Sequence, residues 1–368
     1  MSFTQQDILN ALSHVNDPDI KIDLVTLKMI SNIEVTEHNV RFKVTLTTPA
    51  CPLKEKIKKD CIDAIHQYVS DKLTVEVEMD ANVTSLRKEN VNILPSVKNI
   101  ICVASGKGGV GKSTVAVNLA LSLARLGASV GLIDADIHGP SIPTMLGVKG
   151  VKPQVRLIKD KHYMVPIEAE GIKILSIGLL VDDRQAIVWR GPMVTSALKQ
   201  FVTDCIWGKL DYMVVDMPPG TGDVHITVAQ TLNVTGAVIV TTPQEVALAD
   251  ARKALSMFRL ENINVPVLGV VENMAYFTPA ELPENKYYIF GKDGGKKLAE
   301  EYEVPFLGQL PLVQSIREGG DAGKPISIYG DQSGIEVKAF DELAANVARQ
   351  VAIKNANLAP QSSEPVLS

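Results

Sequence analysis

The sequence of 368 residues predicts an α/β fold, in which helices cover both faces of a mostly parallel sheet, preceded by a small α+β domain. Three observations predict it. A glycine-rich loop stands between an apolar run and a helical stretch, further apolar runs alternate with further helical stretches, and the residues before these follow a different, partly alternating pattern. We expect a small domain over 1–84, a polar linker over 85–98, the α/β domain over 99–354 and a disordered tail over 355–368.

The small domain mixes helix and strand patterns. Val40–Leu46 alternates with period two, as a half-buried strand does, and Leu53–Val69 is amphipathic, as a surface helix is. The expected order is helix Gln5–Val15, strands Ile30–Val35 and Val40–Leu46, helix Leu53–Val69 and strand Leu73–Met79.

The α/β domain begins with the apolar run Ile100–Ala104, which suits a strand buried on both faces. Val115–Leu126 is apolar nearly all round and Gly127 can end it, so we expect a buried helix there. Later strands are expected at Val130–Ile133, Ile172–Ile177, Tyr212–Val215, Ala237–Val240 and Val267–Val271.

The loop between the first strand and its helix has the G-x-x-x-x-G-K-[ST] pattern of a P-loop NTPase. It consists of Gly106, Lys107, Gly108, Gly109, Val110, Gly111, Lys112, Ser113 and Thr114. Glycines let backbone N–H groups surround phosphate oxygens, Lys112 neutralises the terminal phosphates, and Ser113 offers a hydroxyl to Mg²⁺. The loop therefore predicts that the chain binds a nucleoside triphosphate with Mg²⁺.

Aspartates end two of the later strands. Asp134 and Asp136 lie two residues apart and so share an edge, and Asp216 follows an apolar run in the pattern of a carboxylate that holds the Mg²⁺ shell. Because ligands of open α/β sheets collect at the carboxyl ends of strands, we expect all three to face the nucleotide. Helix capping is the alternative for Asp134 or Asp136 singly. The glycine-rich loop Pro218–Asp223 is expected to switch between two arrangements with the terminal phosphate.

Composition and charge limit the partners and the cellular location that we expect for the protein. The formal net charge of −5 offers no broad basic surface, so we expect no nucleic-acid partner. No stretch is long enough to span a membrane and the start lacks a signal-peptide pattern, so we expect a cytoplasmic protein without a membrane partner. Four cysteines without paired spacing argue against a disulfide framework.

Five motifs, in order, resemble the Mrp/ApbC group of deviant-Walker-A ATPases, regarded as iron–sulfur cluster carriers. They are Lys107–Thr114, Asp134–Ser141, Trp189–Pro192, Asp216–Asp223 and Glu272–Met274. The resemblance runs from about residue 99 to about residue 349. It implies a slow ATPase that acts as a nucleotide-gated homodimer and matures apo iron–sulfur proteins with assembly factors.

The small domain has a resemblance of its own. Asp17–Asp19 and Thr47–Pro52 resemble a SufT-like domain that is linked to iron–sulfur assembly.

The resemblance to the ATPases also implies roles for single residues. It implies that Lys107 reaches the phosphates bound by the other subunit of the dimer. Asp136, with Asp134 beside it, is similar to the carboxylate that orients the attacking water. Asn273 resembles the residue whose amide reads the adenine edge, so ATP is the expected nucleotide, and an amide can both donate to and accept from a base.

The sequence departs from this family at the cluster site. Carriers of the group usually place Cys-Pro-x-Cys shortly after the Asn-Met pair, whereas this chain has Thr278-Pro279-Ala280-Glu281. Threonine and glutamate are poor substitutes, because iron–sulfur clusters are ordinarily held by thiolates. The usual ligands of a cluster are therefore absent.

Cys51 is the remaining candidate ligand. It precedes Pro52 at an expected helix start, where unpaired amides can lower the pKa of a thiol, so Cys51, with Asp19, could handle metal or cluster transiently. A purely structural role is the alternative. Cys102 in a buried strand, and Cys61 and Cys205 in expected helices, are interpreted as packing residues.

Three functions remain open. The first is an ATP-hydrolysing homodimer that carries or assembles iron–sulfur clusters. The second is a MinD/ParA-like positioning ATPase, although the tail lacks the basic amphipathic helix such proteins usually need. The third is an ATP-switched scaffold that recruits partners through residues 1–84 and holds no cluster of its own.

Overall fold

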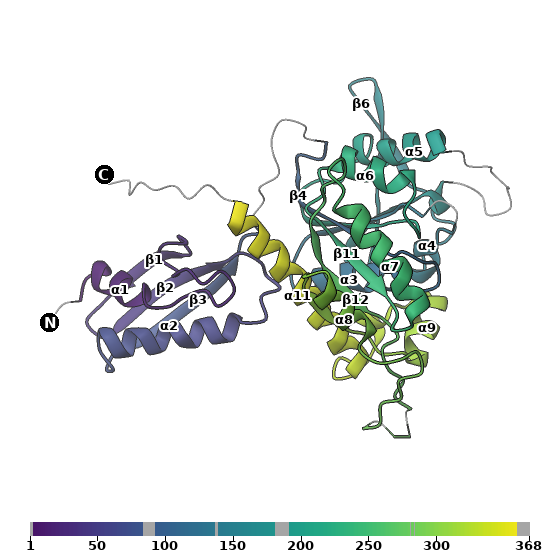
Figure 1. The fold of residues 1–368 in the computed structure, drawn as a ribbon. Coiled ribbons are helices and arrows are strands. Elements are labelled where there is room, and N and C mark those ends of the chain that lie inside the picture. Colours follow the sequence, from purple (N-terminus) through teal and green to yellow (C-terminus); the bar gives the residue numbers. More distant parts are fainter. Residues whose placement is uncertain are drawn as a thin grey trace. The chain divides into compact units, whose positions relative to one another are not determined.

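The computed structural model describes residues 3–83, 93–136, 139–180, 191–279, 281–282 and 284–358 (Figure 1). The chain divides into two compact units. The small unit is formed by Met1–Leu86 with Ala348–Ser368, and the large unit by Arg87–Val347.

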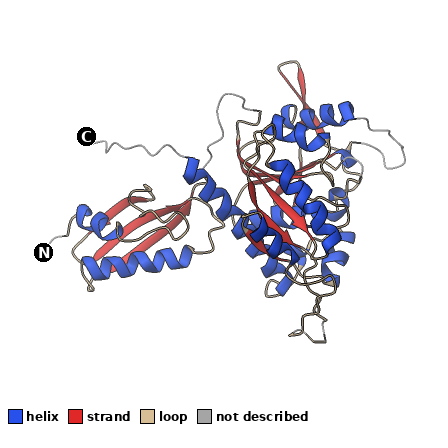
Figure 2. Ribbon diagram, viewed as in Figure 1, coloured by secondary structure: helices blue, strands red, loops and turns tan. Residues whose placement is uncertain are grey.

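The small unit contains a three-stranded sheet and two helices that share one core (Figure 2). Its elements are α1 Gln5–Leu12, β1 Ile30–Val35, β2 Asn39–Leu46, α2 Lys54–Tyr68 and β3 Thr74–Ala81. The pair β1 and β2 is antiparallel, while β2 and β3 are parallel and are joined through α2. Alternate residues of β2, among them Phe42 and Val44, are buried against Ile57 and Ile65 of α2, which explains the period-two pattern.

The large unit is built on an eight-stranded sheet with the strand order β13-β12-β11-β4-β10-β5-β9-β8. The strands are β4 Val97–Ala104, β5 Val130–Asp134, β8 Ile167–Ala169, β9 Ile172–Ser176, β10 Leu210–Asp216, β11 Gly236–Thr241, β12 Val267–Glu272 and β13 Phe306–Gln309. All neighbours are parallel except β8 and β9. The predicted fold class is confirmed.

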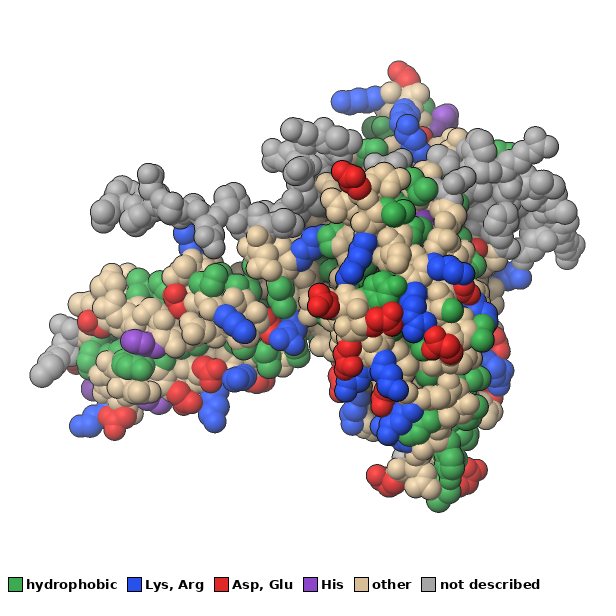
Figure 3. All heavy atoms as spheres, viewed as in Figure 1, with side chains coloured by type: hydrophobic (Ala, Val, Ile, Leu, Met, Phe, Trp, Pro, Cys, Tyr) green, Lys and Arg blue, Asp and Glu red, His purple; other side chains and the backbone are tan. Residues whose placement is uncertain are grey.

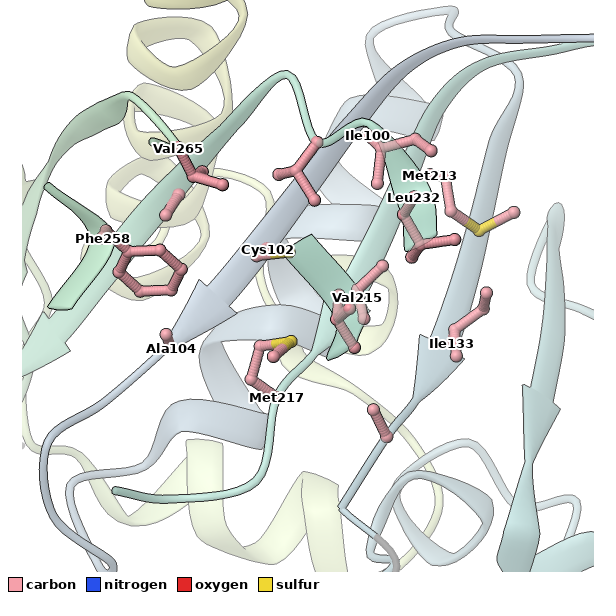
Figure 4. Close-up of a cluster of buried hydrophobic side chains, with 14 of the residues drawn as sticks. Ile100, Cys102, Ala104, Ile133, Met213, Val215, Met217, Leu232, Phe258 and Val265 are labelled. Atoms are coloured by element: carbon pink, nitrogen blue, oxygen red, sulfur yellow. The ribbon is translucent and has the colours of Figure 1, made fainter. Parts of the chain in front are cut away.

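Helices and a short 3₁₀ turn flank this sheet. They are α3 Lys112–Arg125, α4 Ile142–Met145, η2 Ile177–Leu179, α5 Gly191–Thr203, α6 Asp223–Leu232, α7 Glu245–Phe258, α8 Gly294–Glu301, α9 Gln314–Asp321, α10 Ile326–Tyr329 and α11 Ile335–Leu358, which also enters the small unit. Figure 4 shows part of the core, where Ile100 and Cys102 of β4 lie near Val215 of β10 and Phe258 of α7. Because β4 occupies a central position, the loop that follows it opens at the middle of the carboxyl edge of the sheet.

One hairpin of the large unit is not predicted from the sequence. Residues 151–171 form a hairpin of β6 Gln154–Ile158 and β7 Lys161–Val165, followed by β8. The two turn residues, Lys159 and Asp160, have φ of 48° and 61°. Hairpin turns of this kind usually contain Asn-Gly or Asp-Gly, so Lys-Asp gives no recognisable turn signal.

The structure also corrects three boundaries. Strand β4 begins at Val97, inside the expected linker, and α11 continues to Leu358, inside the expected disordered tail. Cys205 lies outside α5, in a bridge to Met164, rather than in a helix. In the part of the chain that is described, no helix is both long and apolar enough to cross a bilayer.

Candidate functional site

The glycine-rich loop joins the carboxyl end of β4 to the N-terminus of α3. Gly109 and Gly111 have φ of 81° and 80°, a conformation that glycine adopts without steric cost. Gly106 lies so close to α7 that a Cβ there would come within 2.0 Å of the Asp250 carbonyl oxygen. The loop can therefore curl in front of the helix N-terminus, where backbone N–H groups favour an anion.

Lys112 is the buried cation of the site, with 6% of its side chain exposed. Its Nζ donates hydrogen bonds to Asp216 Oδ1 at 2.6 Å and to Ser113 Oγ at 3.2 Å, and it lies 3.8 Å from Asp136 Oδ2. The start of α3, the end of β10 and the residues after β5 thus bring together four residues that the sequence singles out.

Asp134 and Asp216 end two neighbouring parallel strands and face each other in register. Both side chains are fully buried. Burial, and then the charge of Asp216, raise the pKa of Asp134 to about 8. Burial raises the pKa of Asp216 as well, but the Lys112 ammonium opposes that effect, so we place the proton of this pair on Asp134.

Ser176 is a site residue that sequence reasoning missed. It ends β9, the strand beside β5, and its hydroxyl donates a 2.9 Å hydrogen bond to Asp134 Oδ2. The backbone N–H of Asp136 donates to Asp134 Oδ1 at 3.1 Å. A lone serine at a strand end has no recognisable pattern, and only the pairing of β9 with β5 brings it to the aspartate.

The residues expected to bind Mg²⁺ are suited to a hard cation. Asp216 Oδ2 is buried and has no hydrogen-bond partner within the described residues, while Asp216 Oδ1 is held by Lys112. Ser113 Oγ accepts at 3.2 Å from the same Lys112 Nζ that donates to Asp216 Oδ1 at 2.6 Å, so the serine hydroxyl and the carboxylate lie around one ammonium group. Magnesium prefers such oxygen ligands and takes most of the rest of its octahedral shell from phosphate and water.

Lys107, the second lysine of the loop, is exposed. Its carbonyl oxygen accepts a 2.9 Å hydrogen bond from Ser105 Oγ, which holds the backbone while the side chain extends into solvent. An exposed lysine is free to reach phosphates outside its own chain, but that role stays a prediction.

Asn273 follows β12 and lies against the loop. Its Nδ2 donates a 2.8 Å hydrogen bond to the Val110 carbonyl oxygen, so the amide braces the loop. A cavity of about 480 Å³ opens beside Gly111, Thr114 and Asn273 and is closed on its other side by residues of α4 and α9. This volume is sufficient for a nucleobase, although the expected contact of Asn273 with adenine stays a prediction.

His225 is a second residue that sequence reasoning missed, and it holds the loop Pro218–Gly222. The side chain is 1% exposed, and its Nδ1 lies 3.3 Å from the Gly222 carbonyl oxygen. Burial lowers the pKa of His225, so the ring is neutral. Its Nε2 is buried with no hydrogen-bond partner in the described part of the protein.

The expected lowering of the pKa of Cys51 is not found, while its role as a cluster ligand stays a prediction. Burial raises the pKa of Cys51, and nearby Asp19 and Asp17 raise it further, outweighing a hydrogen bond from the Leu53 backbone. The Asp19 carboxylate has a partner of its own, because Asp19 Oδ1 lies 2.6 Å from Arg349 Nε.

The other three cysteines are buried. Burial raises the pKa of Cys61, Cys102 and Cys205 to about 12. Across the described ranges, no three His, Cys, Asp or Glu side chains gather as a metal site.

Parts of the predicted motifs lie outside the described residues. These are residues 137–138, residues 189–190, and Ala280 of the segment that replaces Cys-Pro-x-Cys. In that segment Thr278 Oγ1 is buried and Glu281 is exposed.

Two family models match the chain. The NUBPL iron-transfer P-loop NTPase family matches residues 96–348, and the iron–sulfur cluster assembly protein family matches residues 5–78. Together they account for the P-loop and for the small unit's sheet.

Curated proteins called iron–sulfur cluster carrier protein are similar over nearly their whole length. The one from Synechocystis is 45% identical, covering 95% of this chain and 98% of the relative. The one from Deinococcus radiodurans is 48% identical, covering 98% and 99%, and that from Escherichia coli is 42% identical, covering 94% and 91%.

Among solved structures, a nucleotide-binding protein from Archaeoglobus fulgidus in complex with ADP is 35% identical. It has a TM-score of 0.57 and covers 68% of this chain and 98% of its own. The cell-division ATPase MinD from Pyrococcus furiosus is similar at 24% identity, with a TM-score of 0.48, covering 68% of this chain and 98% of its own.

Proposed function

The chain belongs to the iron–sulfur cluster carrier family of P-loop NTPases, and on that premise we propose that it hydrolyses ATP with Mg²⁺ as a nucleotide-gated homodimer. We propose further that it delivers iron–sulfur clusters to apo-proteins together with assembly factors. Its four free cysteines suit a reducing compartment, so we place it in the cytoplasm.

One observation carries the nucleotide part of this proposal. Lys112, buried at the mouth of the P-loop, is paired with Asp216, whose second oxygen is buried and unpaired among the described residues. Breaking a buried ion pair is costly when one charge is left alone. Lys112 would pair with phosphate and Asp216 with Mg²⁺ when the two bind together, so neither charge would be left alone.

The three carboxyl groups of the site differ in protonation and exposure, and we assign them different roles in hydrolysis. Burial raises the pKa of Asp134 to about 8, so this carboxyl is mostly protonated at neutral pH and is not the one to which we assign the attacking water. Asp136 has 14% of its side chain exposed, so it is accessible to water, and we assign to it the orientation of the attacking water. Asp216 and Ser113 would hold Mg²⁺, which when bound neutralises charge on the phosphates.

The lysines provide the test. Lys112→Ala should abolish ATP binding measured by calorimetry, because it removes the buried cation. Lys107→Ala should leave binding intact and slow hydrolysis by about 100-fold, the usual effect of losing one charge on a transferring phosphate. Lys297→Ala, an exposed lysine of α8, serves as the control. Unchanged turnover in both loop variants would contradict the proposed ATPase.

The thiols favour a second candidate function, an ATP-switched scaffold without its own cluster. The thiols at all four cysteine positions have raised pKa values, so none is an accessible thiolate at neutral pH. Such a chain would recruit partners through the small unit and use ATP to time their exchange.

Anaerobic reconstitution with iron and sulfide separates the two candidates. A stoichiometric cluster on the intact chain that is lost in Cys51→Ser supports a carrier that holds its cargo. Absence of a cluster, with ATP hydrolysis intact, supports the scaffold. Cys102→Ser is the control, because that thiol lies in the core of the large unit.

A further inference from the structure

The hairpin β6–β7 differs from the other strands of the large unit, because the side chains of β6 are not packed against the core. It forms a two-stranded sheet of its own and projects from the unit (Figure 1). Every residue of β6 is exposed, including Val155 at 59%, Leu157 at 62% and Ile158 at 44%. A two-stranded hairpin is marginally stable in water, so the uncovered apolar side chains of β6 call for a partner.

The outer edge of β6 is available for pairing. On its inner side β6 is paired with β7, and β7 is anchored to the body of the unit by two backbone bonds. Met164 N–H donates to the Asp204 carbonyl at 2.7 Å, and Ile206 N–H donates to the Met164 carbonyl at 2.8 Å. Within the described residues no other strand pairs with β6, so half of its backbone donors and acceptors face outward.

The side chains of β6 divide into two faces. Val155 and Leu157 share one face, and Arg156 and Ile158 share the other. Ile158 also lines a groove of about 550 Å³ together with Leu94 and Trp207. A strand added at this edge would contact Val155 and Leu157 on one face and Arg156 on the other. Its end near Ile158 would lie beside the groove.

The hairpin and the residues just before it are basic, in a chain whose formal net charge is −5 (Figure 3). Five cations, Lys149, Lys152, Arg156, Lys159 and Lys161, lie within residues 149–162, together with the single carboxylate of Asp160. Lys161 is paired with Asp204 at 2.6 Å. The excess of positive charge favours an acidic segment as the strand that binds beside β6. It disfavours a second copy of the same hairpin, because like charges across a strand pair repel.

The free edge favours a polypeptide over a lipid surface. A membrane offers no donors and acceptors at the spacing of a β-ladder, and outward N–H and C=O groups are costly in hydrocarbon. An extended peptide satisfies the same groups by adding a strand.

We propose that the outer edge of β6 binds an extended, acidic segment of a partner protein by strand addition. In that segment acidic and apolar residues alternate. Its apolar side chains contact Val155 and Leu157, and its carboxylates pair with Arg156 and the flanking Lys152 and Lys159.

The test uses the full chain without nucleotide, so that its outcome does not depend on the ATPase. The probe is a blocked hexapeptide in which glutamate and valine alternate, and its dissociation constant is measured by calorimetry at low salt. We expect binding that protects the β6 amides from hydrogen exchange and weakens with added salt. The double variant Arg156→Glu/Lys159→Glu should weaken binding by about tenfold or more, whereas Lys297→Glu on α8 should leave it unchanged.

Several outcomes would overturn the proposal. One is equal binding of a hexapeptide with lysine in place of glutamate. Others are absence of binding, or binding without protection of the β6 amides. Protection by phosphatidylserine–phosphatidylcholine vesicles but not by the peptide would assign the surface to lipid, and peptide-independent dimers lost in the double variant would assign it to a second copy.

Discussion

At the scale of single residues, the nucleotide site depends on one buried cation among three carboxylates. Lys112 is paired with Asp216, Asp136 lies nearby, and Asp134 is expected to carry a proton. Buried charges are tolerated only when they are paired and hydrogen-bonded, and here Lys112 supplies the partner of Asp216 that phosphate and Mg²⁺ would replace under the proposed function. The supporting residues Ser176 and His225 complete this arrangement from neighbouring elements.

The first prediction concerns Ser176. Ser176→Ala removes the hydrogen bond to Asp134 Oδ2 and leaves a buried oxygen unpaired, which should lower the free energy of unfolding by roughly 1–3 kcal/mol. That hydrogen bond lowers the pKa of Asp134, so its loss should raise that pKa further. Urea denaturation and the pH dependence of ATP hydrolysis are the measurements.

Ser122→Ala is the matched control for Ser176. Ser122 is also fully buried, and its hydroxyl donates to Ser327 Oγ at 3.2 Å, away from the carboxylates. It should cost stability without altering the pH dependence of turnover. If both serine variants shift the pH profile equally, Ser176 has no specific link to Asp134.

The second prediction concerns His225, whose ring holds the loop after Asp216. His225→Leu keeps an apolar filling but loses the contact with the Gly222 carbonyl, so kcat should fall by about tenfold with KM unchanged. His225→Gln retains a side-chain donor and should recover most of the rate. Steady-state kinetics of both variants, with thermal melts, test this. Equal kcat in the two variants would mean that the ring only fills space.

At the scale of elements, the site depends on how the loop between β4 and α3 is held. Gly106 packs against the backbone of α7, and Gly111 packs against the Asn273 amide after β12. The loop is thus fixed by two elements far away in sequence, which preorganises its N–H groups for phosphate.

The third prediction separates backbone strain from crowding in this loop. Gly109 and Gly111 share a positive φ, so alanine at either position should cost about 1–2 kcal/mol. A Cβ at Gly109 meets nothing within 4 Å, whereas one at Gly111 would come within 2.3 Å of Asn273 Nδ2. Gly111→Ala should therefore weaken ATP binding by more than tenfold relative to Gly109→Ala. Calorimetry and melting temperatures give both quantities, and equal losses of affinity would exclude a role for the Asn273 brace.

At the scale of the whole molecule, the raised pKa of Asp134 links folding to pH. The carboxyl has a pKa near 3.8 when unfolded and of about 8 when folded, so the native state holds the extra proton between these values. The stabilisation is complete below pH 4 and is lost as the pH rises toward 8.

The fourth prediction follows from this linkage. The free energy of unfolding of the nucleotide-free protein should fall by about 2 kcal/mol between pH 6 and pH 8, and Asp134→Asn, which does not titrate, should remove that slope. His225, whose lowered pKa acts in the opposite sense, is present in both proteins and cancels in the comparison. Urea denaturation at pH 6, 7 and 8 measures the free energy of unfolding of both proteins and its slope with pH. Equal slopes in the two proteins would show that Asp134 is ionised in the native state.

Most strands could be predicted, because a strand buried on both faces leaves a continuous apolar run. Tyr212–Val215 and Ala237–Val240, for example, fall within β10 and β11. The hairpin β6–β7 could not be predicted, because every residue of β6 is exposed, β7 is at most half-buried, and the turn has an unusual sequence. The aspartates at strand ends were found from local pattern, whereas Ser176 and His225 were not, since neither carries a pattern apart from its neighbours in space.

The sequence by itself determined the P-loop, the parallel sheet and the position of Lys112, Asp134 and Asp216 at one edge of it, because spacing and apolar periodicity are local properties of the chain. Only the tertiary structure decided which groups are paired and protonated. The Cys51 thiol shows the difference. Its place near a helix start favoured a low pKa, but desolvation and the carboxylates of Asp17 and Asp19 raise it, and burial and distance between groups exist only once the chain has folded.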